Sequence, residues 1–94
     1  MPVLRIEHRV PDYEGWKQAF DADPADRRGA GVKRYVVMRA VDDPNHVLID
    51  LEFSTVAQAE ALLGSMRTIW DQIQGKVIFE PIARIVDVVE DAVP

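Results

Sequence analysis

The sequence predicts an α+β fold in which two helices cover one face of a four-stranded antiparallel sheet. The patterns follow one another as strand, helix, strand, strand, helix, strand. The strand-like runs alternate apolar and polar residues, and the helix-like runs place apolar residues three and four positions apart. This order is the ferredoxin-like, split βαβ plan, for which we expect the strand order 4-1-3-2. The 94 residues are expected to form one domain, residues 1–94.

The first strand and the first helix are predicted from the N-terminal fifth of the chain. Residues 3–10 alternate, with an apolar side that faces the predicted core. Asp12 follows a proline and is placed to cap a helix over residues 12–20. Trp16 and Phe20 lie four positions apart on the apolar stripe of that helix. The proline- and glycine-containing connector that follows is predicted to be a loop.

The second and third strands are predicted over residues 32–41 and 46–53, joined by a turn over residues 42–45. The turn contains a proline and an asparagine, which favour this geometry. The third strand has one wholly apolar side, so that side is expected to be covered by the helices. In the second strand we expect Val36 and Met38 to face the helices and Tyr35 and Arg39 to lie on the open face of the sheet.

The last two elements are a second helix and a fourth strand. Thr55 and Gln58 have the spacing of a capping box at the start of the helix. We expect Gly64 and the serine after it to interrupt the helix, leaving a shorter second piece that ends near Gly75. The last strand is predicted over residues 82–89.

The composition excludes several classes of function. A net charge of −5 disfavours nucleic acid and anionic membranes as partners. The chain has no cysteine, which excludes disulfides and thiolate catalysis, and Arg5 and Glu7 interrupt any signal-peptide pattern. We therefore expect a cytoplasmic protein. The open face of the sheet is too apolar for plain solvent and carries charges of both signs, so we expect a second copy of the chain to cover it as a homodimer; the alternative is a sheet face that is wholly exposed to solvent.

The chain resembles the dimeric α/β-barrel superfamily, and within it the small proteins similar to antibiotic biosynthesis monooxygenases. The resemblance rests on the element order, on the segment HRVPDYEGWK at residues 8–17 and on the segment LEFST at residues 51–55. It implies two sheets packed face to face in a homodimer. The superfamily includes cofactor-independent oxygenases of aromatic substrates, haem-degrading enzymes and lactone isomerases, and the fold alone does not choose among them.

The candidate catalytic residues are His8, Tyr35 and Trp70. The resemblance places a polar pocket residue at the position of His8, where a neutral imidazole would act as a base. It also implies that a tryptophan at the position of Trp70 lines the substrate pocket, where an indole stacks on aromatic ligands. Tyr35 is a hydrogen-bond partner for the ligand. The candidate substrate-binding residues are Trp16, Arg39 and Met66, with Arg39 stabilising an enolate-like anion.

Each candidate has a plainer interpretation. His8 would equally be a core histidine, Trp70 and Trp16 core anchors, and the charges on the open face a network of salt bridges. No cofactor and no metal site are predicted. His46 and Asp43 lack a third metal ligand. The resemblance implies that haem-degrading members use a histidine on a helix late in the chain, where this sequence has only Gln72, Gln74 or Lys76. The basic pair at Arg27 is expected to be solvated. Two functions remain open: a small-molecule site for a flat aromatic compound with oxygenase or isomerase activity, and a non-catalytic dimeric accessory module.

Overall fold

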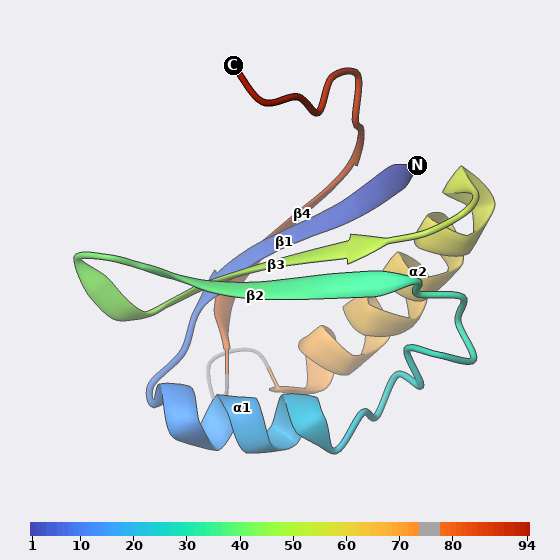
Figure 1. The fold of residues 1–94 in the computed structure, drawn as a ribbon. Helices are drawn as coiled ribbons and strands as arrows, with labels where there is room; N and C mark the ends of the chain where they lie inside the picture. Colours follow the sequence, from blue (N-terminus) through green and yellow to red (C-terminus); the bar gives the residue numbers. More distant parts are fainter. Residues whose placement is uncertain (74–77) are drawn as a thin grey trace.

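The computed structural model describes residues 1–73 and 78–94 and has the predicted α+β architecture (Figure 1). The sheet has the order β2-β3-β1-β4, and all neighbouring strands are antiparallel. Both helices lie on the same side of the sheet (Figure 1), so the ferredoxin-like fold class is confirmed. The elements are β1 (Pro2–Arg9), α1 (Tyr13–Asp21), β2 (Arg34–Ala40), β3 (Asp43–Glu52), α2 (Val56–Ile73) and β4 (Phe79–Asp87).

The core lies between the sheet and the helices. Its largest fully buried side chains come mostly from β1 and β3, whose apolar sides were predicted to face inward. Alternate residues of a strand point to one face, so β1 contributes two of these side chains and β3 three to the same layer, and Phe53 follows directly after β3. The residues from the two central strands and the end of β3 are Leu4, Ile6, Val47, Ile49, Leu51 and Phe53.

Both predicted helix starts are confirmed. The Asp12 carboxylate accepts a hydrogen bond from the Gly15 N–H at 3.1 Å. At the start of α2, Thr55 Oγ1 accepts from the Gln58 N–H at 3.2 Å, and Gln58 Oε1 accepts from the Thr55 N–H at 3.3 Å. This reciprocal pair is a capping box, and it satisfies two N–H groups that the helix leaves without partners. None of the described helices is long and apolar enough to cross a membrane.

The expected interruption at Gly64 is wrong, because α2 is continuous from Val56 to Ile73. Within the helix, the Ser65 and Thr68 hydroxyl groups donate to the backbone carbonyls of Ala61 and Gly64. A β-carbon at position 64 would meet nothing within 4 Å. The C-terminal end of the second helical piece, expected near Gly75, lies outside the described residues.

Gly64→Ala should therefore stabilise the protein by about 0.5–1 kcal/mol, because alanine loses less backbone entropy in a helix than glycine. Gly31→Ala is the matched control with the opposite sign. Gly31 has φ of +97°, and a β-carbon there would lie 2.7 Å from Gln58 Nε2. Urea unfolding of the two variants checks both signs. If Gly64→Ala were destabilising, α2 would not be continuous in solution.

The hairpin between β2 and β3 turns earlier than predicted. The turn is at Val41 and Asp42, and Pro44 lies within β3. The register shifts between Arg39 and Ala40, so the strand pairing extends past the predicted turn residues through an irregularity. Pro44 is tolerated in β3 because it lacks an N–H donor only beside this irregularity, where the regular ladder of hydrogen bonds between the strands is already interrupted.

The predicted faces of β2 are reversed in the structure. Tyr35, Val37 and Arg39 are paired with Leu51, Ile49 and Val47, which belong to the core side of β3. Directly paired residues share a face, so these three β2 residues lie on the helix side. Val36 and Met38 lie on the open face instead. The prediction failed because Val36, Val37 and Met38 are consecutive apolar residues, which leaves the alternation of this edge strand undecided.

Candidate functional site

An apolar cavity lies between the two helices and the connector that follows α1. Its volume is about 90 Å³, and it is partly open to solvent. We call it the aromatic cavity. Its large apolar lining residues are Trp16, Phe20, Met66, Ile69, Trp70 and Ile78, with Ala19, Pro24 and Ala25 completing the wall.

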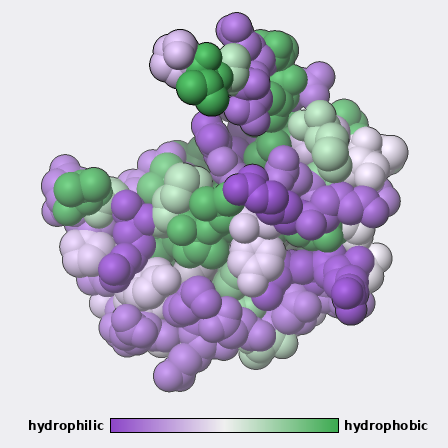
Figure 2. All heavy atoms as spheres, viewed as in Figure 1, coloured by the Kyte–Doolittle hydropathy of each residue, from purple (hydrophilic) through white to green (hydrophobic). Residues whose placement is uncertain are grey.

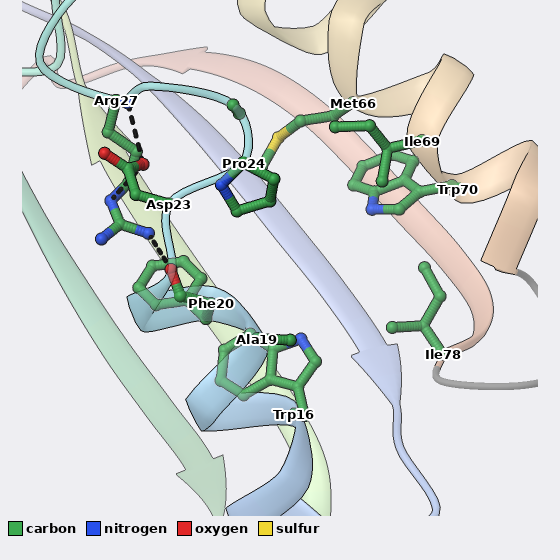
Figure 3. Close-up of a pocket in the computed structure, with 11 residues that line it drawn as sticks. Trp16, Ala19, Phe20, Asp23, Pro24, Arg27, Met66, Ile69, Trp70 and Ile78 are labelled. Atoms are coloured by element: carbon green, nitrogen blue, oxygen red, sulfur yellow. Dashed lines mark hydrogen bonds and ion pairs between the residues drawn. The ribbon is translucent and has the colours of Figure 1, made fainter.

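The two sides of the cavity come from different helices (Figure 3). Trp16, Ala19 and Phe20 of α1 lie opposite Met66, Ile69 and Trp70 of α2, and Pro24 of the connector lies between them. The spacing i, i+3, i+4 puts each set of three on one face of its helix. Trp16 is 6% exposed and Trp70 is 8% exposed, and the rings of Trp16 and Phe20 stack with centroids 5.1 Å apart. Three of the predicted residues, Trp16, Met66 and Trp70, are thus brought together at one cavity.

Arg27 is an unpredicted member of this site. It was expected to be solvated, but its side chain is 13% exposed and its guanidinium carbon lies 3.9 Å from the centre of the Phe20 ring. Its Nη1 donates to the Phe20 carbonyl at 2.7 Å, and its backbone N–H donates to Asp23 Oδ1 at 2.9 Å. These contacts hold Arg27 against the aromatic wall of the cavity (Figure 3). Among the described residues that line the cavity, Arg27 is the one arginine.

His8 is buried on the helix side of the sheet, beneath Trp16. It is 3% exposed, its ring meets the Trp16 ring edge-on with centroids 5.6 Å apart, and it does not line the aromatic cavity. In the described part of the chain its Nδ1 has no hydrogen-bond partner. Burial lowers the pKa of His8 from 6.5 to about 4, with a smaller contribution in the same direction from the nearby His46. The imidazole is neutral at pH 7 and is a weak base, so its role as catalytic base stays a prediction.

The buried His8 should make stability depend on pH. Its folded pKa lies below its unfolded pKa, so between pH 6.5 and pH 4 the unfolded chain binds the extra proton. The contribution of the neutral His8 to the free energy of unfolding is fully present above pH 6.5. It is lost as the pH drops towards 4, by about 3 kcal/mol in total. Urea unfolding of the wild type and of His8→Phe across this range isolates the effect. If the difference in unfolding free energy between the two proteins did not change with pH, the burial of His8 would be contradicted.

Tyr35 and Arg39 lie on the helix side and outside the aromatic cavity. Arg39 stacks over the Tyr13 ring at 4.3 Å, so it is held away from the cavity wall. Tyr35 packs edge-on against Phe20 at 5.5 Å and lies under the Arg27 guanidinium at 4.8 Å. Tyr35 belongs to a neighbouring surface hollow of about 330 Å³, which it shares with the cations Arg27, Arg28, Lys33 and Arg34. We call this the basic hollow.

The open sheet face carries a set of ion pairs between adjacent strands. Arg5 binds Asp50 through two hydrogen bonds of 2.8 and 2.7 Å. Arg34 contacts Glu52 at 3.2 Å, and His46 contacts Glu7. Apolar side chains lie between these pairs. The open sheet face is lined by Val3, Arg5, Glu7, Arg34, Val36, Met38, His46, Leu48, Asp50, Glu52, Ile82, Arg84 and Val86.

Candidate metal ligands do not gather within residues 1–73 and 78–94. No three His, Asp or Glu side chains there lie close enough to hold an ion. His46 is occupied by Glu7, and Asp43 accepts from the Asn45 N–H at 3.0 Å and lies 3.9 Å from Arg9 Nε. Gln72 is exposed on α2, and Gln74 and Lys76 lie outside the described residues.

The sequence analysis missed Ile69, Ile78 and the connector residues Pro24 and Arg27. Ile69 and Ile78 carried no chemical signal that separates a cavity wall from a core. Arg27 had a usable signal: the carboxylate of Asp23 lies four positions before it, and both come within seven positions after the aromatic residue Phe20. That pattern favours a side chain folded back on the helix end, although loop geometry had to be known to place it.

Comparison with known proteins finds matches in solved structures. No protein-family model and no curated protein matches the chain. A putative antibiotic biosynthesis monooxygenase from Deinococcus radiodurans aligns with a TM-score of 0.67 and 14% identity, over 100% of this chain and 98% of that one. A variant of SnoaB, a cofactor-independent oxygenase from Streptomyces nogalater, aligns with a TM-score of 0.72 and 11% identity, over 96% and 94% of the chains.

A third match bears on assembly. A dimeric ferredoxin-like protein from an uncultured marine organism aligns with a TM-score of 0.63 and 8% identity, over the full length of both chains. Identities this low show a common fold and carry no residue roles. The expected resemblance is therefore confirmed at the level of the fold: the chain has the ferredoxin-like fold of the antibiotic biosynthesis monooxygenase-like proteins.

Proposed function

We propose that this protein binds a flat aromatic compound in the aromatic cavity. The observation that carries the proposal is the pair of nearly buried tryptophans, Trp16 and Trp70, on the two helices that face each other across this cavity. Ligand sites are typically concave and apolar with a few placed polar groups, and Arg27 and Asp23 supply those groups here. Indole and phenyl rings favour aromatic ligands through offset or edge-on stacking.

The size of the cavity limits what it holds in the present conformation. About 90 Å³ is less than the several hundred cubic ångströms expected for a complete polycyclic site, and it is also below the roughly 150 Å³ of a closed cavity that binds benzene, so even a single ring would extend into the open side. A polyketide-like ligand would therefore place one ring between the tryptophans and extend through the open side. The alternative is displacement of the connector at Pro24, which forms part of the wall.

We further propose cofactor-independent oxygenation or a related isomerisation as the activity. In such an oxygenation, a ring CH₂ and O₂ give a ring carbonyl and water, and the substrate anion supplies the electrons. The protein's part is to exclude water, to orient the ring and to stabilise the anion. Trp16 and Trp70 would provide the first two. The fold shared with a cofactor-independent oxygenase supports this activity without identifying a substrate.

We propose that a second copy of the chain covers the open sheet face. Its charges of both signs allow a twofold-related copy to match cation with anion, and its exposed apolar side chains include Ile82, 62% exposed. Figure 2 shows small apolar patches among polar residues, including the C-terminal tail, where Val89 and Val93 are 94% exposed. A neighbour of the same fold is described as dimeric.

The second candidate is a non-catalytic dimeric accessory module. The ion pairs Arg5–Asp50 and Arg34–Glu52 favour the accessory module. The charged groups in these pairs bind each other, so they are not available as reactive groups on the open sheet face. The small volume of the aromatic cavity points in the same direction.

Oxygen uptake distinguishes the two candidates. Flat aromatic compounds with an oxidisable ring CH₂ are added under air to the wild type, to Trp70→Ala and to Tyr35→Phe, and the consumption of oxygen is followed with an electrode. The enzyme proposal predicts uptake by the wild type, strongly reduced in Trp70→Ala. Absence of uptake by the wild type, or equal rates in all three proteins, would favour the accessory module.

A further inference from the structure

Positive charge is concentrated at the end of the connector and the start of β2, in a protein that is acidic overall. Four of the protein's 11 basic residues lie within eight consecutive positions, 27–34, which contain no acidic residue. All four line the basic hollow. The remaining polar lining residues are Asp23 and Tyr35. An acidic chain that collects cations at one hollow creates a local site for anions.

The basic hollow and the aromatic cavity share two residues, Asp23 and Arg27. Arg27 therefore has one side at the cavity between the tryptophans and the other at the cluster of cations. Its position is fixed by the hydrogen bond from Nη1 to the Phe20 carbonyl and by the Phe20 and Tyr35 rings on which it lies. Among the described residues, its Nη2 donates no hydrogen bond, so this nitrogen can donate to a ligand.

The charges of the hollow do not cancel. Asp23 lies 3.5 Å from Arg27 Nε, and Glu52 lies 3.2 Å from Arg34 Nη1. Arg28 and Lys33 make no ion pair within residues 1–73 and 78–94. Two cations thus remain beyond the two pairs, beside the open side of an apolar cavity.

We propose that the ligand of the aromatic cavity is an aromatic anion: a ring held between the tryptophans that carries a carboxylate or phenolate group bound by Arg27. This inference rests on the proposed binding function and adds the charge of the substrate. Arg27 can donate to the anion through Nη2, and a hydrogen bond from a guanidinium to a carboxylate or phenolate is charge-assisted and therefore stronger than one between neutral groups. Arg28 and Lys33 attract the anion over a longer distance and contribute less.

The test compares benzoate with benzamide, which have nearly the same shape and differ in charge at pH 7. The chain contains two tryptophans, and both line the cavity, so their ¹⁵N-labelled indole resonances report binding directly. We expect the wild type to bind benzoate about tenfold more tightly than benzamide, the range of a charge-assisted hydrogen bond. Arg27→Gln should reduce this preference to about one, because the affinity for benzoate falls more than the affinity for benzamide. Arg27→Lys should restore part of it.

Lys17→Gln is the control for net charge, because Lys17 pairs with Asp21 on α1 and lines neither hollow. It should keep the full preference for benzoate. Equal affinity of the wild type for both probes, or equal losses for both in Arg27→Gln, would overturn the anion proposal while benzamide binding still supports the cavity. Binding of neither probe by the wild type would overturn the proposed function itself and this inference with it.

Discussion

Replacing Trp70 by alanine should abolish the binding of aromatic compounds and should destabilise the protein by about 3–5 kcal/mol. The indole is 8% exposed and forms one wall of the aromatic cavity opposite Trp16. Its removal takes away both a stacking surface and buried apolar area. Affinity for an aromatic probe, followed by the resonance of the remaining indole, and urea unfolding measure the two effects separately.

Leu62→Ala is the matched control for Trp70→Ala. Leu62 is 2% exposed on the same helix and does not line the cavity, and its truncation should cost about 2–5 kcal/mol. Both variants are compared at a temperature where both remain folded, and Trp70→Phe provides a milder change. Loss of binding in Leu62→Ala as large as that in Trp70→Ala would mean that stability, and not the indole, governs binding.

Replacing Asp50 by arginine should convert the proposed dimer into monomers at micromolar concentration. Asp50 binds Arg5 in the middle of the open sheet face, and Arg5 is paired on its other side with Arg84. The substitution would align three cations across adjacent strands and repeat them in the facing copy, where like charges cost several kcal/mol. Sedimentation velocity measures the mass of the species directly.

The double change Arg5→Asp with Asp50→Arg is the matched control for charge pairing. It keeps the cross-strand pair and the net charge, so the folded chain should remain as stable as the wild type within about 1 kcal/mol. Because both copies carry the exchange, a cation at one of these positions still faces an anion at the other across a twofold interface, so dimerisation should recover relative to Asp50→Arg. A wild type that sediments as a monomer at every concentration would refute the homodimer.

Most of the fold could be predicted because its signals are local and agree with one another. The apolar side of β3, the Asp12 cap and the capping box at Thr55 each follow from spacing alone, and all three are present. The errors fall where spacing is ambiguous. Val36, Val37 and Met38 give an edge strand two equally apolar sides, and only pairing with β3 decides between them. Gly64 weakens a helix by propensity, but the cost of one glycine is about 1 kcal/mol, and α2 continues through it.

The candidate site could be predicted only in part. Trp16, Met66 and Trp70 were chosen as large apolar residues at helical spacing, and the fold brings them to one cavity. Arg39 was misplaced together with the face of its strand. Arg27 was missed because its contacts depend on how the connector folds, with Asp23 at φ of +58° and Arg27 returned to the end of α1. Such loop geometry is not encoded in periodicity.

The central claim is that the cavity between α1, α2 and the connector is a ligand site, and filling it is the most direct test. Ala19 lines the cavity from α1, and Ala19→Phe would occupy it without removing any other side chain. Ala57→Phe, at an exposed position of α2 outside the cavity, is the control. Titration with benzamide, followed by both indole resonances, should show binding to the wild type and to Ala57→Phe and none to Ala19→Phe. Undiminished binding by a folded Ala19→Phe would contradict the account.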